Sequence, residues 1–327
     1  MEVTVMPFKM VFLPPQSDTT RKWAGQLAHD VRDSNVIVPE TIDEAKPDIV
    51  DAEAAFGTIL PEVLELAGKL RWLAAPAIAP PAGYYYPALI EHPVQVTNFR
   101  GIFNEHIAAH IMSFVLAFSR GLHYYVRRQL AGEWKREPHN SGIIYLPEST
   151  ALIVGVGGIG AETARLCTAF GMRVIGIDAR LPQAPEGVAE LHRPAALDSL
   201  LPKADFVILT IPHTPQTEGL MNAERFARMK RSAFFINIGR GKTTKLDALN
   251  AALREGTIGG AGLDVYEIEP LPKDHPLWTA PNTLMTPHSA GFGPYLDERR
   301  YAILAENARR FAAGEPLGRL VDKANWF

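Results

Sequence analysis

Residues 150–160 constrain the fold more than any other stretch, because an apolar run there leads directly into spaced glycines. Their sequence, TALIVGVGGIG, places Gly155, Gly157 and Gly160 at the G-x-G-x-x-G spacing. A strand that turns tightly into a helix leaves backbone N–H groups unpaired, and with the helix dipole they attract a pyrophosphate. Gly155 permits the turn, Gly157 lets a phosphate approach, and Gly160 lets the helix pack against its strand. We therefore predict a dinucleotide-binding unit.

The residues that follow supply the context that this motif requires. Residues 159–170 carry apolar side chains at helical spacing, and Gly171 ends the pattern. The next apolar run, 173–177, leads to Asp178, eighteen positions after Gly160. A carboxylate there accepts hydrogen bonds from the ribose hydroxyls and repels a 2′-phosphate, which favours NAD. Arg180 would offset part of this repulsion, so NADP remains the less favoured alternative.

Length and composition indicate a soluble globular protein of two domains. The chain has 327 residues, of which 47% are apolar and 21% charged. A net charge of −3 argues against a nucleic acid or an anionic membrane as the main partner. The single cysteine, Cys167, excludes an internal disulfide and lies in the helical stripe, where a core role is expected. With no signal pattern and no membrane-length apolar run, we predict a cytoplasmic protein.

The first hundred residues alternate strand and helix signals, which predicts a parallel sheet covered by helices. A helix through Trp23 and Leu27 would be capped by Asp18, and Pro61 suits the first turn of another. The expected strands lie at 11–13, 36–38, 49–50, 70–74 and 94–96.

Helical and strand patterns also alternate in the rest of the chain. From Asn104 to Leu122 a continuous apolar stripe predicts a long helix, which is either core or a subunit interface. His106 and His110 stand four apart, but no third ligand is nearby, so we expect no metal site. Further strands are expected at 206–210, 233–238, 260–265 and 283–286, with helices capped by Thr244 and Asp247 and running from Tyr295 to Phe311.

Three ionisable residues follow strand ends on the side of the glycine turn: Arg240, Glu269 and His288. The carboxyl ends of parallel strands face one crevice, so these side chains are predicted to converge there. Hydride transfer to a ketone needs a proton donor, which His supplies at neutral pH, and a carboxylate that orients it. A forked guanidinium suits a substrate carboxylate. Each residue taken alone also fits an ordinary surface or core role.

The order and spacing of these segments resemble the D-isomer-specific 2-hydroxyacid dehydrogenases. This family includes glyoxylate/hydroxypyruvate reductases, D-lactate dehydrogenase and phosphoglycerate dehydrogenase. The resemblance covers roughly residues 70–327 and is carried by residues 155–160 with Asp178, 208–217, 236–241, 261–265, 269–272 with 276–278, and 286–291.

The resemblance implies an α/β fold in which a Rossmann nucleotide-binding domain (101–291) is inserted into a flavodoxin-like substrate domain (1–100 and 292–327). It implies that Arg240 binds the substrate carboxylate and carbonyl, that His288 is the acid/base, and that Glu269 pairs with His288. Asp264 would face the nicotinamide carboxamide. The helix from Asn104 would belong to a homodimer interface. The expected cofactor-binding residues are Gly155, Gly157, Gly158, Ile159, Gly160, Asp178, Arg180, Pro212, Thr217, Ile238, Gly239 and Asp264.

The loop after Trp72 departs from the family pattern. The family usually places a glycine there, beside backbone N–H groups that bind the substrate carboxylate. This chain instead has APAIAP at 75–80, and proline offers no N–H. We place Ala77 and Ile78 in the substrate loop and predict a differently shaped, more apolar pocket.

The sequence thus predicts an enzyme that interconverts a 2-oxo acid and a D-2-hydroxy acid with NAD(H). A nearer alternative, formate dehydrogenase, pairs its catalytic histidine with glutamine, and Glu269 speaks against it. An alternative of another class is an NAD-sensing, corepressor-like regulator, since the family of D-isomer-specific 2-hydroxyacid dehydrogenases includes such members. Low-complexity regions and appended tails, which would favour a regulator, are absent from the sequence.

Overall fold

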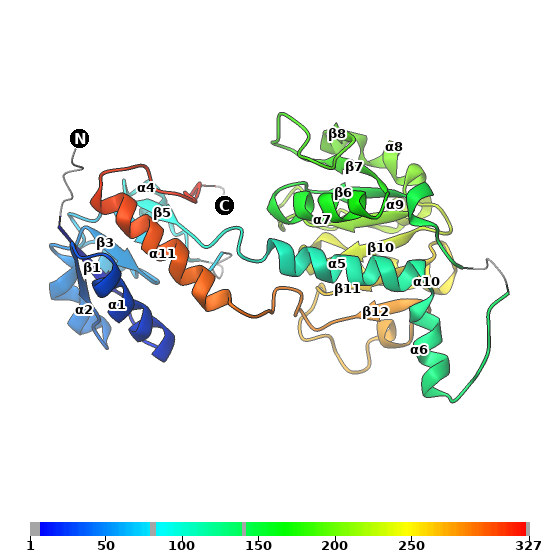
Figure 1. Ribbon diagram of the computed structural model, residues 1–327, viewed down its shortest axis with the longest axis horizontal. Coiled ribbons are helices and arrows are strands. Elements are labelled where there is room, and N and C mark those ends of the chain that lie inside the picture. The colour runs from blue at the N-terminus through cyan, green and yellow to red at the C-terminus, as the bar shows by residue number, and fades with distance from the viewer. Residues whose placement is uncertain (1–6, 79–82, 139–141, 325–327) are drawn as a thin grey trace. The chain divides into compact units, whose positions relative to one another are not determined.

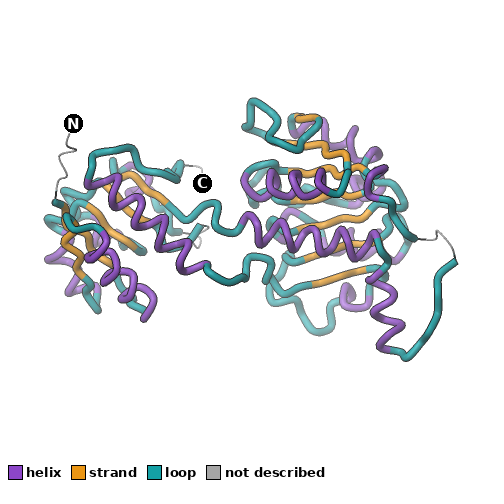
Figure 2. The backbone as a smooth tube through the Cα atoms, viewed as in Figure 1, coloured by secondary structure: helices purple, strands orange, loops and turns teal. Residues whose placement is uncertain are grey.

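The computed structural model describes residues 7–78, 83–138 and 142–324, and the chain divides into two units (Figures 1 and 2). Unit 1 comprises Met1–Ile102 and Pro294–Phe327, and unit 2 comprises Phe103–Gly293. The chain therefore enters unit 2 after Ile102 and returns to unit 1 at Pro294.

Unit 1 is built on a five-stranded parallel sheet in the order β2-β1-β3-β4-β5. The order reverses between β1 and β3, so strands are added on one side of β1 and then on the other. Its elements are β1 (Phe8–Phe12), α1 (Asp18–Asp30), β2 (Ser34–Ile37), α2 (Ile42–Ile49), β3 (Ala54–Phe56), α3 (Pro61–Leu64), β4 (Trp72–Ala74), α4 (Pro87–Glu91), β5 (Gln95–Thr97) and α11 (Leu296–Ala312).

Two predictions for unit 1 were wrong. The expected strand at 49–50 does not form, because Ile49 is the last residue of α2, whose N-cap Thr41 accepts a hydrogen bond from the Glu44 N–H. The third strand of the chain is instead β3, which follows α2. It consists of two alanines and a phenylalanine that are fully or almost fully buried between β1 and β4. Alanine has low strand propensity, so burial between two strands decides this element. The α1 helix is capped by Ser17, whose side chain accepts from Thr20 N, and Asp18 is its first helical residue.

The last helix of the chain, α11, packs on the sheet that the first hundred residues form. Phe311 of α11 lies 5.0 Å from Phe8 of β1 and 5.6 Å from Trp72 of β4, measured between ring centroids. The Arg71 guanidinium lies 4.5 Å above the Phe311 ring. Unit 1 therefore needs both ends of the chain for its core.

Unit 2 contains a seven-stranded parallel sheet in the order β12-β11-β10-β9-β6-β7-β8, which reverses between β6 and β9. This is the doubly wound arrangement predicted from the glycine motif. Its strands and helices are α5 (Asn104–Ser119), α6 (Leu122–Leu130), β6 (Thr150–Val154), α7 (Gly158–Ala169), β7 (Arg173–Ile177), β8 (Glu190–His192), α8 (Leu197–Leu200), β9 (Phe206–Leu209), α9 (Ala223–Arg228), β10 (Phe234–Asn237), α10 (Leu246–Arg254), β11 (Gly260–Leu263) and β12 (Thr283–Met285). Short 3₁₀ turns lie at Leu146–Glu148, Pro194–Ala196, Leu201–Lys203, Gly241–Thr243 and Pro276–Thr279.

The apolar stripe after Asn104 is core, one of the two alternatives that the sequence left open. On α5, Ile111, Phe114, Val115 and Phe118 are at most 4% exposed and pack with α7 on one face of the sheet (Figure 1). The predicted continuity to Leu122 was wrong, because Gly121 adopts φ +68° and starts the separate helix α6.

The predicted capping by Thr244 and Asp247 was also wrong. Helix α10 has Lys245 as its N-cap, with no side-chain cap. The Thr244 hydroxyl instead accepts a hydrogen bond from the buried Asn237 amide. Among the described residues, no helix is both long enough and apolar enough to cross a bilayer.

Candidate active site

The glycine turn has the geometry that its spacing predicted. Gly155 follows β6 with φ +92°, a conformation that favours glycine. A Cβ on Gly160 would lie 1.9 Å from the Gly155 carbonyl oxygen, so only glycine lets α7 pack this close to its strand. A Cβ on Gly157 would meet nothing within 4 Å, so the space above this N-cap is open. No side chain of the described residues caps α7, and its first N–H groups suit a phosphate.

Asp178 lies directly after β7 and organises a short turn. Its Oδ1 accepts hydrogen bonds from the backbone N–H groups of Arg180 (2.9 Å) and Leu181 (3.1 Å). Both bonds fall on one oxygen, and within the described chain no donor contacts Oδ2. The Arg193 guanidinium donates to the Asp178 carbonyl oxygen at 3.3 Å. A carboxylate oxygen is thus available for a hydroxyl, and two arginines lie in the same short region.

The loop after β9 contains the next pair of expected cofactor residues. The Thr217 hydroxyl donates to the Pro212 carbonyl oxygen at 2.8 Å and accepts from the Thr214 N–H at 2.7 Å. These bonds fold residues 212–217 into a compact turn at the carboxyl end of the sheet. The neighbouring turn begins at Ile238, which is 6% exposed, and Gly239, where a Cβ would lie 2.5 Å from the Ile211 carbonyl oxygen.

Arg240 follows β10, and the buried side chain of Asn237 holds its loop. The Asn237 amide oxygen accepts from the Gly239 N–H at 3.0 Å, and its nitrogen donates to the Arg240 carbonyl oxygen at 3.2 Å. The Thr243 hydroxyl donates to the same carbonyl oxygen at 2.7 Å. Sequence reasoning gave Asn237 no role, although a polar residue ending an apolar strand directly before G-R-G was a usable signal.

Close packing fixes the other side of this loop. A Cβ on Gly241 would lie 1.7 Å from the carbonyl oxygen of Tyr266, so the two loops approach as far as glycine allows. The pKa of Arg240 is lowered, mainly because its guanidinium loses water, and the Glu269 carboxylate opposes this shift. A guanidinium remains charged in either case, so the loop presents a fixed cation beside Glu269.

Glu269 and His288 form the predicted pair. The His288 Nδ1 atom lies 2.7 Å from Glu269 Oε2, and Glu269 Oε1 accepts the Tyr266 N–H at 2.9 Å. An ionised carboxylate only accepts hydrogen bonds, so Nδ1 carries the shared proton and Nε2 is left for other partners. The His288 side chain is 52% exposed, so the imidazole can be reached from outside.

The backbone of His288 is held in an uncommon conformation by Asp264. His288 has φ +52°, and its N–H donates to the Asp264 carbonyl oxygen at 2.8 Å. The Asp264 side chain, 2% exposed, accepts from Ser289 N (2.8 Å), Ala290 N (3.0 Å) and the Thr286 hydroxyl (2.6 Å). These bonds stabilise the turn that aims the imidazole. The expected contact of Asp264 with the nicotinamide remains a prediction.

A second histidine, His110, extends this network, although it was not among the predicted site residues. His110 Nε2 lies 2.9 Å from the Thr286 hydroxyl. The Thr286 hydroxyl donates its hydrogen bond to Asp264. His110 Nε2 is therefore the donor to Thr286 Oγ1. Burial lowers the pKa of His110, and the Asp264 carboxylate opposes this shift. His106 does not join it: its Nε2 is buried without a partner among the described residues, beside Gly293.

The predicted substrate loop lies in unit 1, after β4. Ala77 and Ile78 are half-buried, and the Ile78 carbonyl oxygen accepts from the Asn98 amide at 3.3 Å. Residues 79–82 of this loop lie outside the described residues.

Comparison with known proteins identifies the family to which this arrangement belongs. A sequence model described as "D-isomer specific 2-hydroxyacid dehydrogenase, NAD binding domain" matches residues 112–290. A glyoxylate reductase from Korarchaeum cryptofilum is 35% identical over 268 residues, covering 80% of this chain and 79% of the relative.

Solved structures are similar over nearly the whole chain. A D-isomer specific 2-hydroxyacid dehydrogenase from Xanthobacter autotrophicus Py2, in complex with NADPH and MES, has a TM-score of 0.82 and 30% identity, covering 98% of this chain and 100% of that one. An NADPH-dependent glyoxylate/hydroxypyruvate reductase from Sinorhizobium meliloti, in complex with NADP and sulfate, has a TM-score of 0.77 and 26% identity, covering 98% and 100%. The regulatory alternative finds no support in these relatives. The chain belongs to the D-isomer specific 2-hydroxyacid dehydrogenase family, and it is an NAD(P)-dependent hydroxyacid dehydrogenase.

Proposed function

We propose that this enzyme interconverts a 2-oxo acid and a D-2-hydroxy acid, with His288 as the general acid/base and Arg240 as the clamp for the substrate carboxylate and carbonyl. The observation that carries the proposal is the 2.7 Å contact between His288 Nδ1 and Glu269. Because Nδ1 is engaged by the carboxylate, the proton that moves during reaction is the one on Nε2. NAD(H), when bound, supplies or accepts the hydride.

In the reducing direction, the protonated His288 donates its Nε2 proton to the ketone oxygen as negative charge develops there. Glu269 stabilises the imidazolium before the transfer and keeps the ring oriented, and the Tyr266 N–H fixes Glu269 in turn. In the oxidising direction, neutral His288 takes the hydroxyl proton at the same nitrogen. The same residues therefore serve both directions.

Arg240 completes the site because its guanidinium offers parallel N–H donors that match a carboxylate. Asn237 and Thr243 anchor its loop through the Arg240 carbonyl oxygen, and neither contact uses the guanidinium. One of its donors contacts the neighbouring Gly239 carbonyl oxygen at 2.7 Å, which restrains the direction of the fork. A short 2-oxo acid presents the carboxylate and carbonyl oxygens that such a cation binds.

The reaction is tested by assaying a panel of 2-oxo acids with NADH and NADPH in parallel. Glyoxylate, hydroxypyruvate, pyruvate, 4-methyl-2-oxopentanoate and phenylpyruvate cover small to bulky side chains. Turnover of at least one acid is expected. For every acid except glyoxylate, whose product is achiral, the product should be the D-hydroxy acid by chiral chromatography. No turnover of any acid with either cofactor would reject the proposal.

We further infer that NAD is the preferred cofactor, because the Asp178 carboxylate would oppose a 2′-phosphate. Asp178→Ala should shift the ratio of kcat/KM with NADH to that with NADPH toward NADPH by roughly tenfold, which equals about 1.4 kcal/mol. Asp247→Ala, at an exposed acid of the same unit, serves as the matched control and should keep the wild-type ratio. A wild-type preference for NADPH would show that Arg180 and Arg193 outweigh Asp178.

We also infer a homodimer through unit 2. The apolar side chains that α5 leaves uncovered are few, but the segment after it exposes Leu122 (49%), Val126 (51%), Leu130 (83%), Trp134 (100%) and Tyr145 (67%). Exposed apolar groups gathered in one segment mark an interaction surface.

Negative charges placed in this exposed apolar segment are expected to break the dimer. The variant with Leu130→Asp and Trp134→Asp should elute as a monomer in size-exclusion chromatography with light scattering, whereas the wild type should elute as a dimer. Val50→Asp, at a residue of unit 1 that is 51% exposed, should remain dimeric. A monomeric wild type at micromolar concentration would contradict this inference.

A further inference from the structure

The turn that contains His288 follows a strand at the edge of its sheet. β12 has three residues, and its neighbour in the seven-stranded sheet is β11. A general acid needs a defined direction, because a misplacement of about 1 Å can cost about 100-fold in rate. The sheet supports this turn from one side, so the element that packs over it decides how firmly His288 is held.

That element is α5, which approaches the end of β11 more closely than a larger residue would allow. A Cβ on Gly262 of β11 would lie 2.8 Å from the Phe114 ring of α5. Four helical residues advance by about 6 Å and two strand residues by about 6.6 Å. His110, one turn before Phe114, therefore lies over Asp264, and its Nε2 atom is 4.0 Å from Asp264 Oδ1. The packing of α5 on the sheet brings an imidazole to the buried carboxylate.

The Thr286 hydroxyl connects the two side chains. It lies 2.6 Å from Asp264 Oδ1, 2.9 Å from His110 Nε2 and 3.5 Å from the Leu263 carbonyl oxygen. A hydroxyl donates one hydrogen bond, and the nearest acceptor, which is also the charged one, is Asp264. His110 therefore donates from Nε2 to the hydroxyl oxygen. The Phe114 ring meets the imidazole edge to face at 5.0 Å, which holds the imidazole in this direction.

The Asp264 carboxylate carries this support to the residues that follow His288. It is 2% exposed, and it accepts the backbone N–H groups of Ser289 and Ala290 in addition to the Thr286 hydroxyl. His288 itself has φ +52°, a conformation that persists only where the surroundings impose it. If the hydroxyl turned away, a buried carboxylate would lose a donor, which is costly. The contacts on the two sides of Asp264 are therefore coupled.

We propose that His110 is a positioning residue, which fixes the direction of the His288 imidazole through Thr286 and Asp264. The inference rests on the proposed function, in which His288 is the general acid/base. In this role His110 transfers no proton to the substrate. Its neighbour Ile111 and the next turn's Val115 are fully buried in the core, so α5 gives the turn a rigid reference.

The first test removes the donor and keeps the ring. His110→Phe should lower kcat for 2-oxo acid reduction by roughly tenfold or more, because the imidazole of His288 is less well aimed. KM for the acid should stay within about twofold of the wild type, since Arg240 lies on a different loop. His110→Gln places an amide N–H as many bonds from the backbone as Nε2, and should restore kcat to within about threefold. Steady-state kinetics measure both parameters.

The connection through Thr286 is tested separately. Thr286→Val removes the hydroxyl at nearly constant shape and should lower kcat at least as much as His110→Phe, whereas Thr286→Ser keeps the hydroxyl and should keep most of kcat. If His110 acts through Thr286, the double variant with His110→Phe and Thr286→Val loses no more than Thr286→Val alone. The pair at residue 286 also provides the test if His110→Phe does not fold.

The matched control is Ser113→Ala. Ser113 is an exposed residue of α5 whose hydroxyl donates to the His110 carbonyl oxygen at 2.7 Å. Its variant removes a hydrogen bond from the same helix without touching Thr286 and should keep wild-type kcat.

The outcomes separate this inference from the proposed function. Wild-type kcat in His110→Phe, equal losses of kcat in His110→Phe and His110→Gln, or losses that multiply in the double variant would each overturn the positioning role. A large loss of kcat in His288→Ala would meanwhile leave the acid/base assignment standing. If His288→Ala keeps wild-type kcat, or if the wild type turns over no 2-oxo acid, the proposed function fails first, and His110 has no acid/base to position.

Discussion

Replacing His288 by alanine is expected to lower kcat for 2-oxo acid reduction by roughly 10²- to 10⁴-fold, the usual contribution of a positioned general acid. The imidazole is the group that we place at the ketone oxygen, and alanine leaves no proton donor there. The affinity for NADH, followed by fluorescence titration, should change little, because the glycine turn and Asp178 lie on other loops.

The matched control is His29→Ala. His29 is an exposed histidine of unit 1 whose Nδ1 lies 2.9 Å from the Asp30 carboxylate, so it mimics the pair without belonging to the site. Its variant should keep wild-type kcat. Glu269→Gln should lower kcat less than His288→Ala, because the ring loses its stabilising charge but keeps its proton. Retention of kcat by His288→Ala would exclude the acid/base role.

Replacing Arg240 by lysine is expected to raise KM for the 2-oxo acid and to lower kcat. Lysine keeps the positive charge but loses the fork, so at least one charge-assisted hydrogen bond to the substrate disappears. A bond of this kind contributes about 1.5–3 kcal/mol, which corresponds to a loss of roughly 10- to 100-fold in kcat/KM. Steady-state kinetics with the best acid of the panel measure both parameters.

The loop itself should survive this substitution. Asn237 and Thr243 bind the backbone carbonyl of residue 240, and neither contact uses the guanidinium. Arg231→Lys, at an exposed arginine of the same unit, controls for the general effect of such an exchange. Kinetics of Arg240→Lys that match the wild type in both parameters would refute the clamp.

The sequence was sufficient to predict the parts of the fold that depend on local pattern. The glycine spacing with its flanking strand and helix predicted the turn at Gly155, and the structure has that turn with φ +92°. The alternation of strands and helices predicted two parallel sheets. The order of the strands within each sheet was not predicted, because a local pattern does not say on which side of its neighbour a strand is added.

Other features depend on contacts that no local pattern contains. β3 forms from two alanines because β1 and β4 bury it on both sides, whereas the β-branched pair at 49–50 is taken by a helix that Thr41 caps. The roles of Asn237 and Asp264 arise only once distant loops have folded around their side chains. For example, Asp264 binds residues that follow it by about 25 positions.

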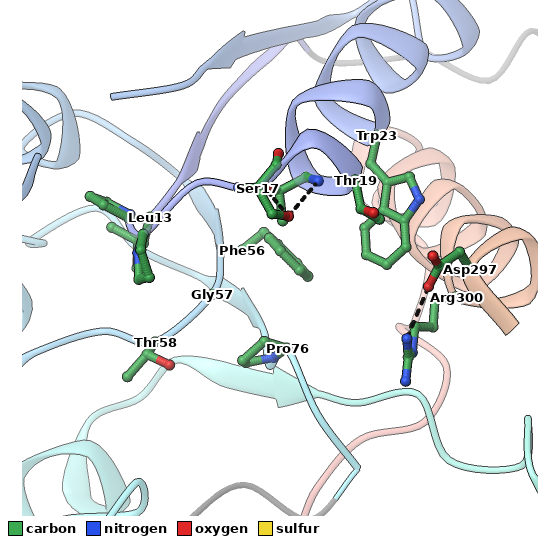
Figure 3. Close-up of a pocket in the computed structure, with 13 residues that line it drawn as sticks. Leu13, Ser17, Thr19, Trp23, Phe56, Gly57, Thr58, Pro76, Asp297 and Arg300 are labelled. Atoms are coloured by element: carbon green, nitrogen blue, oxygen red, sulfur yellow. Dashed lines mark hydrogen bonds and ion pairs between the residues drawn. The ribbon is translucent and has the colours of Figure 1, made fainter. Parts of the chain in front are cut away.

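The contact between Glu269 and His288 could be predicted from the sequence for a physical reason. Glu269 and His288 follow neighbouring strands, and parallel strands end at a common edge, so their meeting follows from topology. A cavity of about 410 Å³ at the carboxyl ends of the unit 1 strands (Figure 3) could not be predicted in the same way. It needs the loops after three strands, the first turns of α1, and helix α11, which begins only at Leu296.

The division of the chain has a consequence for how such an enzyme diversifies. The residue proposed to choose the cofactor follows β7, and the residues proposed for substrate binding and proton transfer follow β10, β11 and β12. These segments do not overlap, so mutational drift in the first can change the preferred cofactor while the residues proposed for proton transfer are inherited intact. A library confined to the turn at residues 178–181 and to Arg193 is therefore the economical starting point for moving this scaffold between nicotinamide cofactors in biocatalysis.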